Sequence, residues 1–333
     1  MKKILILIYL LIFSSLLFAQ TENITVAFYN VENLFDTIND PQIKDDEFTP
    51  EGEKHWTNER YHKKLNDIAK VVNSINKNQI PDIIGFAEVE NKLVLEDLIK
   101  TEYLNSKKYE IIHEESPDVR GIDVALIYNP DKFKYVNHQK IPIPLDTEYK
   151  VRDILYVKGI LLDTDTLHIF VNHWKSRSGG HEQTEPQRVQ CALTLKNVID
   201  SVKVINPDAH ILIMGDFNDT PSNTSICNTL KADNTKTEES LYNLMLPLSK
   251  EGVGTNSYRN KWYLLDQIIV SNNMIGDTSV IIVKDKKGYI FNPEWITFTN
   301  NQGNKSPNRT YGGPNYYGGY SDHYPVYTII TKQ

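Results

Sequence analysis

The sequence predicts an α/β domain with packed β-sheets, and the order of its apolar segments is the main reason. Short apolar runs at 83–87 and 210–214 are typical of buried strands. Segments 61–75 and 189–202 instead carry apolar residues at helical spacing, which predicts amphipathic helices. Because strands alternate with helices early in the chain and predominate late, the pattern favours sheets that pack together.

The individual elements follow from local signals along the chain. In order, the expected strands are 24–29, 83–87, 122–128, 165–172, 210–214, 267–270 and 326–330. The polar segment 39–58 contains two prolines and a glycine, so we expect a surface loop there. Pro81 ends the first helix, and the Tyr/Gly-rich run 311–320 is expected to be a flexible loop before the last strand.

The composition excludes several classes of protein. The chain has 333 residues, of which 40% are hydrophobic and 24% charged, so it is not collagen-like, coiled-coil or wholly disordered. No repeat or flexible linker interrupts it, which predicts a single domain over 20–333. Cys191 and Cys227 fit neither a zinc motif nor a redox pair. They either form one bridge or are two small buried residues.

The first 19 residues have the layout of a secretory signal peptide. Lys2 and Lys3 precede the apolar run 4–18, and Ala19 marks the expected cleavage position. The run is shorter than the ~20 residues that a membrane-spanning helix needs. We therefore expect a monomer secreted to the periplasm or the medium, with no stable membrane insertion after cleavage.

The charge limits how the protein can meet nucleic acid. Cleavage removes two lysines, which leaves 34 basic and 43 acidic residues, a net charge of −9. A broad basic face that wraps nucleic acid is thereby excluded, because neutralising phosphates requires Lys and Arg. Contact with nucleic acid must be local and transient, as in an enzyme whose metal ions counter the phosphate charge.

The most informative motif follows the strand at 210–214. The strand stops at Gly215, and the side chains of Asp216 and Asn218 then point the same way because strand side chains alternate. Asp216 is suited to hold a metal or orient a water, and Asn218 to donate to a phosphate oxygen. Taken alone, an ordinary Asp/Asn turn would also explain the segment.

Asp322 and His323 stand directly before the last expected strand. They place a carboxylate next to a possible general base, since a free imidazole has a pKa near ~6.5. Three other strands also end in polar residues, at 30–33, 88–91 and 172–177. Polar groups that converge cost desolvation energy unless something pairs with them, so these strand ends indicate a common site.

Together these motifs resemble the endonuclease/exonuclease/phosphatase family, the pancreatic deoxyribonuclease-like superfamily. The resemblance extends from Asn30 to His323 with the motifs in family order, and the opening run 30–35 looks most like secreted bacterial members. It implies a four-layer α/β sandwich, in which two mixed sheets pack face to face with helices outside. It also implies a metal-dependent phosphoric ester hydrolase.

The resemblance assigns the metal ligands. Glu88 matches the glutamate that binds the catalytic ion and Asn30 the asparagine beside it, while Glu32 would contribute through water. Oxygen ligands of this kind suit hard ions, so the expected cofactor is Mg²⁺, or alternatively Mn²⁺ or Ca²⁺.

The resemblance also implies the catalytic residues, which are His173, Asp216, Asn218, Asp266, Asp322 and His323. His323, oriented by Asp266, is expected to take a proton from the attacking water. Asn218 and His173 would hold the non-bridging oxygens of the phosphate.

Basic residues near these positions are expected to bind substrate. Arg152 occupies the place of a family arginine near the phosphate, although the glutamate and proline that usually follow it are absent. Lys175 and Arg177 lie in a loop after His173 and would grip a nucleic-acid backbone.

Two further groups of residues have open roles. Arg120 and Asp123 are either near the site or form an ion pair or a turn. The aromatic side chains of Trp174, Trp262 and Tyr258 either stack on the substrate or pack in the core.

The function that fits best is therefore a secreted metal-dependent nuclease, which hydrolyses DNA or RNA by attack of a His-activated water on a metal-bound phosphate. The alternative is a phosphodiesterase or phosphatase that acts on phospholipid or phosphosugar head groups. A third possibility is a binding protein without activity on the same scaffold.

Overall fold

The computed structural model describes residues 22–145, 147 and 150–333. The expected signal peptide lies outside these residues. Within them, no helix is long and apolar enough to cross a membrane.

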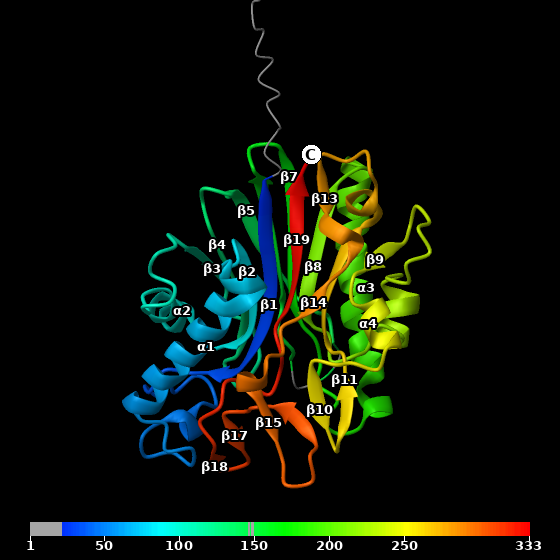
Figure 1. Ribbon diagram of the computed structural model, residues 1–333. Coiled ribbons are helices and arrows are strands. Elements are labelled where there is room, and N and C mark those ends of the chain that lie inside the picture. Colours follow the sequence, from blue (N-terminus) through cyan, green and yellow to red (C-terminus); the bar gives the residue numbers. More distant parts are fainter. Residues whose placement is uncertain (1–21, 146, 148–149) are drawn as a thin grey trace, which may run out of the picture.

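Two mixed sheets form the centre of the described part of the chain (Figure 1). The seven-stranded first sheet has the order β13-β19-β1-β2-β4-β3, with β14 pairing to β19. Its strands are β1 (Asn23–Leu34), β2 (Ile83–Val89), β3 (Glu110–His113), β4 (Asp123–Tyr128), β13 (Ile281–Val283), β14 (Tyr289–Ile290) and β19 (Val326–Lys332). The six-stranded second sheet has the order β5-β6-β7-β8-β12-β9. Its strands are β5 (Phe133–Ile141), β6 (Ile154–Leu161), β7 (Asp165–His173), β8 (His210–Asp216), β9 (Leu241–Asn243) and β12 (Asp266–Ser271).

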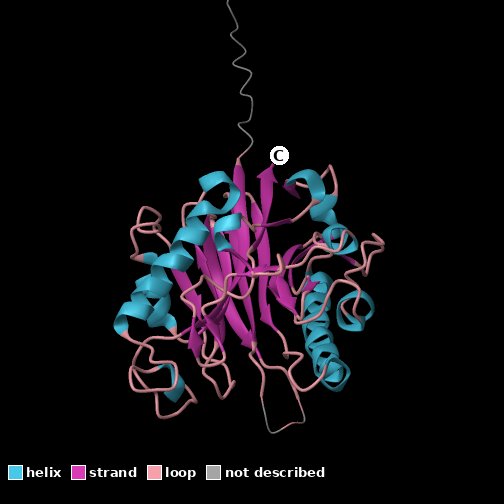
Figure 2. Ribbon diagram, turned by 60° about the horizontal axis from the view of Figure 1, so that its bottom comes forward, coloured by secondary structure: helices cyan, strands magenta, loops and turns pink. Residues whose placement is uncertain are grey.

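Helices cover the outer faces of both sheets (Figure 2). α1 (Asn58–Asn78) and α2 (Lys92–Ile99) lie over the first sheet, and α3 (His181–Ile205) lies over the second. The short α4 (Leu246–Lys250) packs Leu248 against the core between the sheets. Single helical turns complete the helices: η1 (Asp46–Phe48), η2 (Ser225–Thr229), η3 (Asn272–Ile275), η4 (Lys284–Lys286) and η5 (Glu294–Ile296). The expected four-layer α/β sandwich is thereby confirmed.

The protein has three apolar layers, one between the two sheets and one between each sheet and its helices. The alternation of strand side chains explains them. On β8, Leu212 and Met214 pack between the two sheets, whereas Ile211 and Ile213 pack toward α3. All four side chains are fully buried, which is why this strand is apolar on both faces. On α1, Leu65 and its helical neighbours pack against the outer face of the first sheet.

The strand register brings distant residues to one edge of the sandwich. β7 and β8 are parallel, with His173 opposite Asp216, and β12 is antiparallel to β8, with Asp266 also opposite Asp216. β1 and β2 are parallel and end at the same edge. Parallel strands end together, so the polar residues that follow them necessarily meet.

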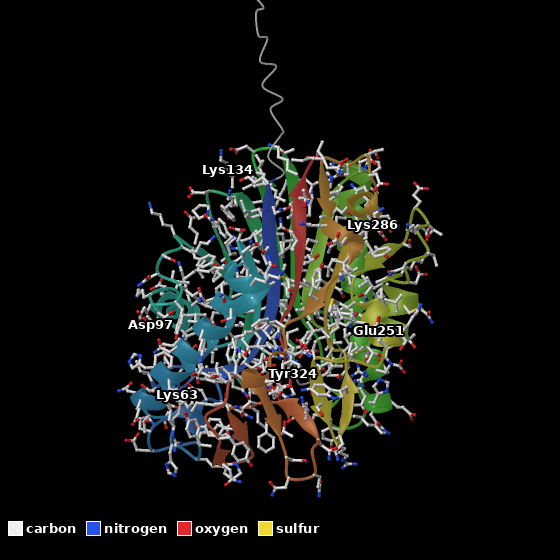
Figure 3. All side chains as sticks on the ribbon, in the orientation of Figure 1. Lys63, Asp97, Lys134, Glu251, Lys286 and Tyr324 are labelled. Atoms are coloured by element: carbon white, nitrogen blue, oxygen red, sulfur yellow. The ribbon has the colours of Figure 1, made fainter. Side chains whose placement is uncertain are left out.

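Three hairpins extend below this edge in Figure 1. They are β10–β11 (Asn256–Tyr258 and Lys261–Tyr263), β15–β16 (Thr297–Thr299 and Lys305–Pro307) and β17–β18 (Tyr311–Gly312 and Asn315–Tyr316). Tyr324, labelled in Figure 3, lies at this end of the molecule, whereas Lys134 lies at the opposite end.

The structure corrects two expectations about loops. Segment 39–58 is not wholly a surface loop, because Phe48 and Trp56 are buried against the face of the first sheet. Segment 311–320 is not a free loop either, since it contains the β17–β18 hairpin. The ammonium group of the buried Lys64 donates to the Tyr320 carbonyl (2.8 Å) and secures the end of this segment.

Candidate active site

Asp216 lies at the centre of the polar cluster at the sheet edge. Its Oδ2 accepts a hydrogen bond from Nδ2 of Asn30 (3.0 Å). The same oxygen lies 3.6 Å from Nε2 of His173 and 3.8 Å from Nε2 of His323. Burial raises the pKa of Asp216 to about 6, and the His323 charge counteracts part of that rise. A carboxylate in this position favours a cationic partner.

Glu88 approaches the same point from the end of β2. Its backbone has a φ of +63°, at an irregularity in the pairing of β2 with β4, and this conformation turns the side chain into the site. The carboxylate accepts from the backbone N–H of Asn33 (3.0 Å) and from Nδ2 of Asn30 (3.3 Å). Burial and the nearby Asp322 raise the pKa of Glu88.

His323 is held by Asp266. Nδ1 of His323 lies 2.6 Å from Oδ2 of Asp266, and both side chains are buried. Although burial alone would lower the pKa of His323, the carboxylates of Asp266 and Asp216 raise it well above its ordinary value. The pairing leaves Nε2 directed toward Asp216.

Ser321 connects the loop of His323 with β1. Its hydroxyl donates to the Asn30 carbonyl (2.7 Å) and accepts from the backbone N–H of His323 (3.1 Å). Asp322 points toward the rim instead, where it forms an ion pair with Arg309 (2.7 Å). Oδ1 of Asp322 is 3.9 Å from Nε2 of His323.

The donor set fits a hard divalent cation. Asp216 supplies a buried carboxylate and Glu88 one that is 16% exposed, and among the described residues Oδ1 of Asp266 is buried without a hydrogen-bond partner. Asp216, Asp266 and His323 each offer one atom within 4.8 Å of the others. Glu88 and Asp216 are the groups that would hold Mg²⁺ or Mn²⁺, because carboxylate oxygens are the ligands that these ions prefer.

The orientations of Asn30 and Glu32 differ from those of metal ligands. The Asn30 amide turns its nitrogen toward the carboxylates, while its oxygen accepts from the backbone N–H of Glu32 (3.0 Å). Glu32 accepts from the backbone N–H groups of Thr310 (2.6 Å) and Tyr311 (3.2 Å). As placed here, Asn30 fixes the spacing of the two carboxylates, and Glu32 fixes the 310–311 segment.

Arg152 is a buried residue that holds the end of β7 in place. Its buried guanidinium donates to the carbonyls of His173 (3.1 Å) and Trp174 (2.5 Å) and pairs with Asp118 (2.8 Å). These contacts occupy the side chain within the protein, so the structure places it as a support for β7 rather than at the surface expected for a substrate ligand.

Asp118 is the residue that the sequence analysis missed. Besides Arg152, it binds Arg120, whose Nη2 lies 3.2 Å away and whose side chain is 48% exposed. Its pKa is lowered to about 2, because these two arginines outweigh the effect of burial. Arg120 is only two positions from Asp118 in the sequence, but Arg152 is 34 positions away. The role of Asp118 therefore becomes visible only when the fold brings Arg152 close to it.

Asp123, whose role was open, is an internal structural partner. It accepts from the backbone N–H of Ser116 (2.9 Å), and its Oδ2 lies 3.2 Å from Nε2 of His113. Asp123 thus contacts His113 and not Arg120, which binds Asp118 instead. Arg120 is more exposed, and its charge acts on Glu88.

Asn218 is oriented by its backbone and by the neighbouring loop. It has a φ of +51°, its N–H donates to Oδ1 of Asp216 (2.9 Å), and its side chain donates to the Trp174 carbonyl (3.1 Å). Arg177 donates to the Asn218 carbonyl (2.6 Å) and pairs with Asp219 (3.2 Å). Arg177 thus holds the turn of Asn218 in place.

His173 and Lys175 remain available to a ligand. Nδ1 of His173 is buried and has no hydrogen-bond partner among the described residues, and burial together with Arg152 lowers the pKa of the ring well below its ordinary value. In the described part of the chain, Lys175 forms no ion pair. Burial and the charges of Arg152 and Arg120 lower its pKa.

The aromatic residues divide between core and rim. Trp174 is buried and packs edge-to-face on Phe217, and Trp262 stacks on Tyr324 at 5.6 Å. Tyr258 is 60% exposed and is the only one of the three aromatic candidates at the rim. Cys191 and Cys227 are both free thiols, so they do not form a bridge.

A four-layer α/β sandwich with carboxylates and histidines at the strand ends defines a class of hydrolytic proteins. The model of the Endonuclease/Exonuclease/phosphatase family matches residues 25–332. The chain therefore belongs to this family, whose members are phosphoric ester hydrolases. The resemblance found in the sequence is thereby confirmed.

Solved structures with the same fold differ in the ligands and activities that their descriptions name. Zebrafish (D. rerio) TDP2 complexed with a single-strand DNA product has a TM-score of 0.56 at 14% identity, covering 93% of this chain and 99% of that one. The human Nocturnin catalytic domain with bound sulfate has a TM-score of 0.56 at 17% identity, covering 95% and 98%. A mannosyl-6-phosphatase of Bacteroides thetaiotaomicron has a TM-score of 0.55 at 17% identity, covering 92% and 99%. No curated protein sequence matches the chain at a significant level.

Proposed function

We propose that the protein is a metal-dependent phosphodiesterase that hydrolyses nucleic acid. The observation that carries this proposal is the convergence of Nε2 of His173 and Nε2 of His323 on one oxygen of Asp216, at 3.6 and 3.8 Å. Glu88 approaches from the side, with Oε1 3.8 Å from Nε2 of His173. Carboxylates and imidazoles from four strand ends thus face one small volume.

The chain's own residues divide the chemistry among them. With Nδ1 bound to Asp266, His323 presents Nε2 to take a proton from an attacking water. His173 and Asn218 would hold the non-bridging phosphate oxygens as charge develops on them. When bound at Glu88 and Asp216, a divalent ion would neutralise phosphate charge and offset the negative charge around His323.

A nucleic-acid strand is the substrate that the surroundings favour. Lys175, which forms no ion pair in the described part of the chain, and the half-exposed Arg120, which is paired with Asp118, place positive charge beside His173 in an otherwise acidic protein. Cations at this position attract the phosphates of a strand locally, without the broad basic face that tight, non-specific binding requires. The similarity to a TDP2 structure with a single-strand DNA product supports the same assignment.

A phosphatase acting on a phosphosugar is the second candidate. It is favoured by the comparable likeness to a mannosyl-6-phosphatase, which this chain matches over 99% of that protein's length. The same carboxylates and histidines would serve a phosphomonoester, so only the substrate separates the two proposals.

Plasmid nicking and cleavage of a labelled oligonucleotide test the first proposal. The wild-type protein should cleave both with Mg²⁺ and neither with EDTA, and His323→Ala should be inactive while retaining its fold. Release of inorganic phosphate from mannose 6-phosphate without cleavage of nucleic acid would contradict the nuclease and support the second candidate.

We also propose that the protein is secreted, on the basis of the lysine–apolar–alanine order of residues 2–19. Intact-mass measurement of protein recovered from the periplasm or medium should give a chain that begins near Gln20. Recovery of the full-length chain inside the cell alone would contradict secretion.

A further inference from the structure

A groove of about 180 Å³ lies between the β10–β11 and β15–β16 hairpins. Its lining includes Ser257, Arg259, Asn260, Phe298, Asn300 and Lys305. Pockets that enclose a whole drug-sized ligand are typically ~300–1,000 Å³. This groove is smaller, so its size suits one unit of a longer substrate.

Strand β10 links the groove to the catalytic histidine. Asn256, the first residue of β10, pairs with His323 through the backbone, and its side chain donates to the Asp322 carbonyl (3.0 Å). Ser257, the next residue, already lines the groove. A substrate bound at His323 that extends along β10 would therefore enter it.

The wall formed by β15–β16 offers an aromatic face with polar groups beside it. Phe298 is 53% exposed and stands opposite Ser306 in the hairpin, so both side chains lie on the same face. Asn300, just beyond the strand, also lines the groove, and its side-chain oxygen accepts from the backbone N–H groups of Gln302 and Asn304. An exposed ring flanked by hydroxyl and amide groups can stack on a base and bind its edge.

The wall formed by β10–β11 contributes an exposed cation. Arg259 and Asn260 both have positive φ values, +50° and +61°, as in the tight two-residue turns that join hairpin strands. The Arg259 guanidinium lies 5.2 Å from the centre of the Tyr258 ring. In the described part of the chain it forms no ion pair, so its charge is available to a phosphate.

We propose that this groove is a subsite for the nucleotide next to the cleaved phosphodiester of a single strand. Phe298 stacks on the unpaired base, and Arg259 contacts the adjoining phosphate. The inference rests on the proposed nuclease function and adds to it a preference for unpaired strands, because a base inside a duplex cannot reach Phe298.

The test compares a long and a short substrate of the same enzyme. A ten-nucleotide single strand reaches the groove, whereas bis(p-nitrophenyl) phosphate is a phosphodiester without neighbouring nucleotides. Phe298→Ala and Arg259→Ala should each raise KM for the oligonucleotide, by about 5- to 150-fold for the stacking residue. For the short substrate, kcat/KM should stay within about twofold of wild type, and Phe298→Trp should restore the oligonucleotide KM.

Tyr135→Ala is the matched control, because Tyr135 is a comparably exposed aromatic residue (43%) on β5, next to the Lys134 labelled at the opposite end in Figure 3. Tyr135→Ala should leave the kinetics on both substrates unchanged. Equal losses on both substrates for Phe298→Ala, or no loss on either, would overturn the subsite. Impaired hydrolysis of mannose 6-phosphate with unchanged oligonucleotide cleavage would also overturn it, since the groove would then bind a sugar.

Failure of the proposed function gives a different result. If the wild-type protein cleaves neither substrate with Mg²⁺ or Mn²⁺, the nuclease proposal fails by itself. Fluorescence anisotropy of a labelled single strand then tests the groove without catalysis, in the His323→Ala background. Phe298→Ala should weaken this binding at least fivefold, and an unchanged Kd would overturn the subsite.

Discussion

Oδ2 of Asp266 lies 2.6 Å from Nδ1 of His323, although 57 positions separate the two residues. Asp266 begins β12, and His323 precedes β19 in the other sheet, so the pair joins the two sheets at their polar edge. The contact fixes both the tilt of the imidazole and the nitrogen that faces Asp216. Because orientation and basicity both depend on this one contact, it offers the sharpest test of the site.

Asp266→Asn should lower kcat by about 10²- to 10⁴-fold, because the imidazole loses the carboxylate that orients it and stabilises its protonated form. Steady-state kinetics on an oligonucleotide measure the effect, with circular dichroism as the check on folding. A folded variant that keeps kcat within tenfold of wild type would rule out the proposed pairing of base and carboxylate.

Glu88→Gln should remove metal-dependent stabilisation. At a Mg²⁺ concentration of 100 times Kd, the wild-type protein should gain about 2.7 kcal/mol in free energy of unfolding, since the ion binds only the folded state. Thermal unfolding with and without Mg²⁺ measures the gain, and EDTA should reverse it. Equal stabilisation of Glu88→Gln and wild type would show that the ion binds elsewhere.

Asp118→Asn should destabilise the fold by about 3–5 kcal/mol, because it leaves the buried Arg152 guanidinium without its counter-charge. Urea unfolding measures the loss, and kcat should fall as well because Arg152 supports His173 and Trp174. The exposed Asp131→Asn is the matched control and should be neutral. A loss below 1 kcal/mol would show that Arg152 does not depend on this partner.

Buried His168 should make stability depend on pH. Burial lowers its pKa to about 4 in the folded protein, against an ordinary value of 6.5, so the unfolded chain binds the proton more tightly. Its contribution is complete above pH 6.5 and is lost progressively as the pH falls toward 4. Urea unfolding at several pH values should show a shallower loss in His168→Phe than in wild type. His62→Phe, which replaces an exposed histidine, is the control. The same dependence of the free energy of unfolding on pH in His168→Phe and wild type would contradict the assignment.

The limits of sequence interpretation are visible in particular strands. β8 and β2 were predicted because both their faces are buried, which gives uninterrupted apolar runs. β5 was not predicted, because it is an edge strand whose residues 134–140 are largely exposed and polar. Its place depends on pairing with β6, and pairing leaves no local signal in the sequence.

The same division holds at the site. The chemical types of Glu88, Asp216 and His323, and their places at strand ends, are readable from the chain, as is the family to which they belong. The directions in which their side chains point are not readable from the chain. Whether Arg152 reaches a substrate or supports β7 depends on Asp118, and whether Asn30 offers oxygen or nitrogen depends on the backbone of Glu32.

The sequence by itself determined which strands are buried, where polar groups leave the sheets, and the family to which the order of these motifs belongs. Tertiary structure alone decided which polar groups face the active site and which are paired instead with neighbours such as Asp118 and Asp219. The physical reason is that burial and periodicity are local properties of a segment, whereas hydrogen bonds and ion pairs between distant segments depend on the register and packing of the sheets.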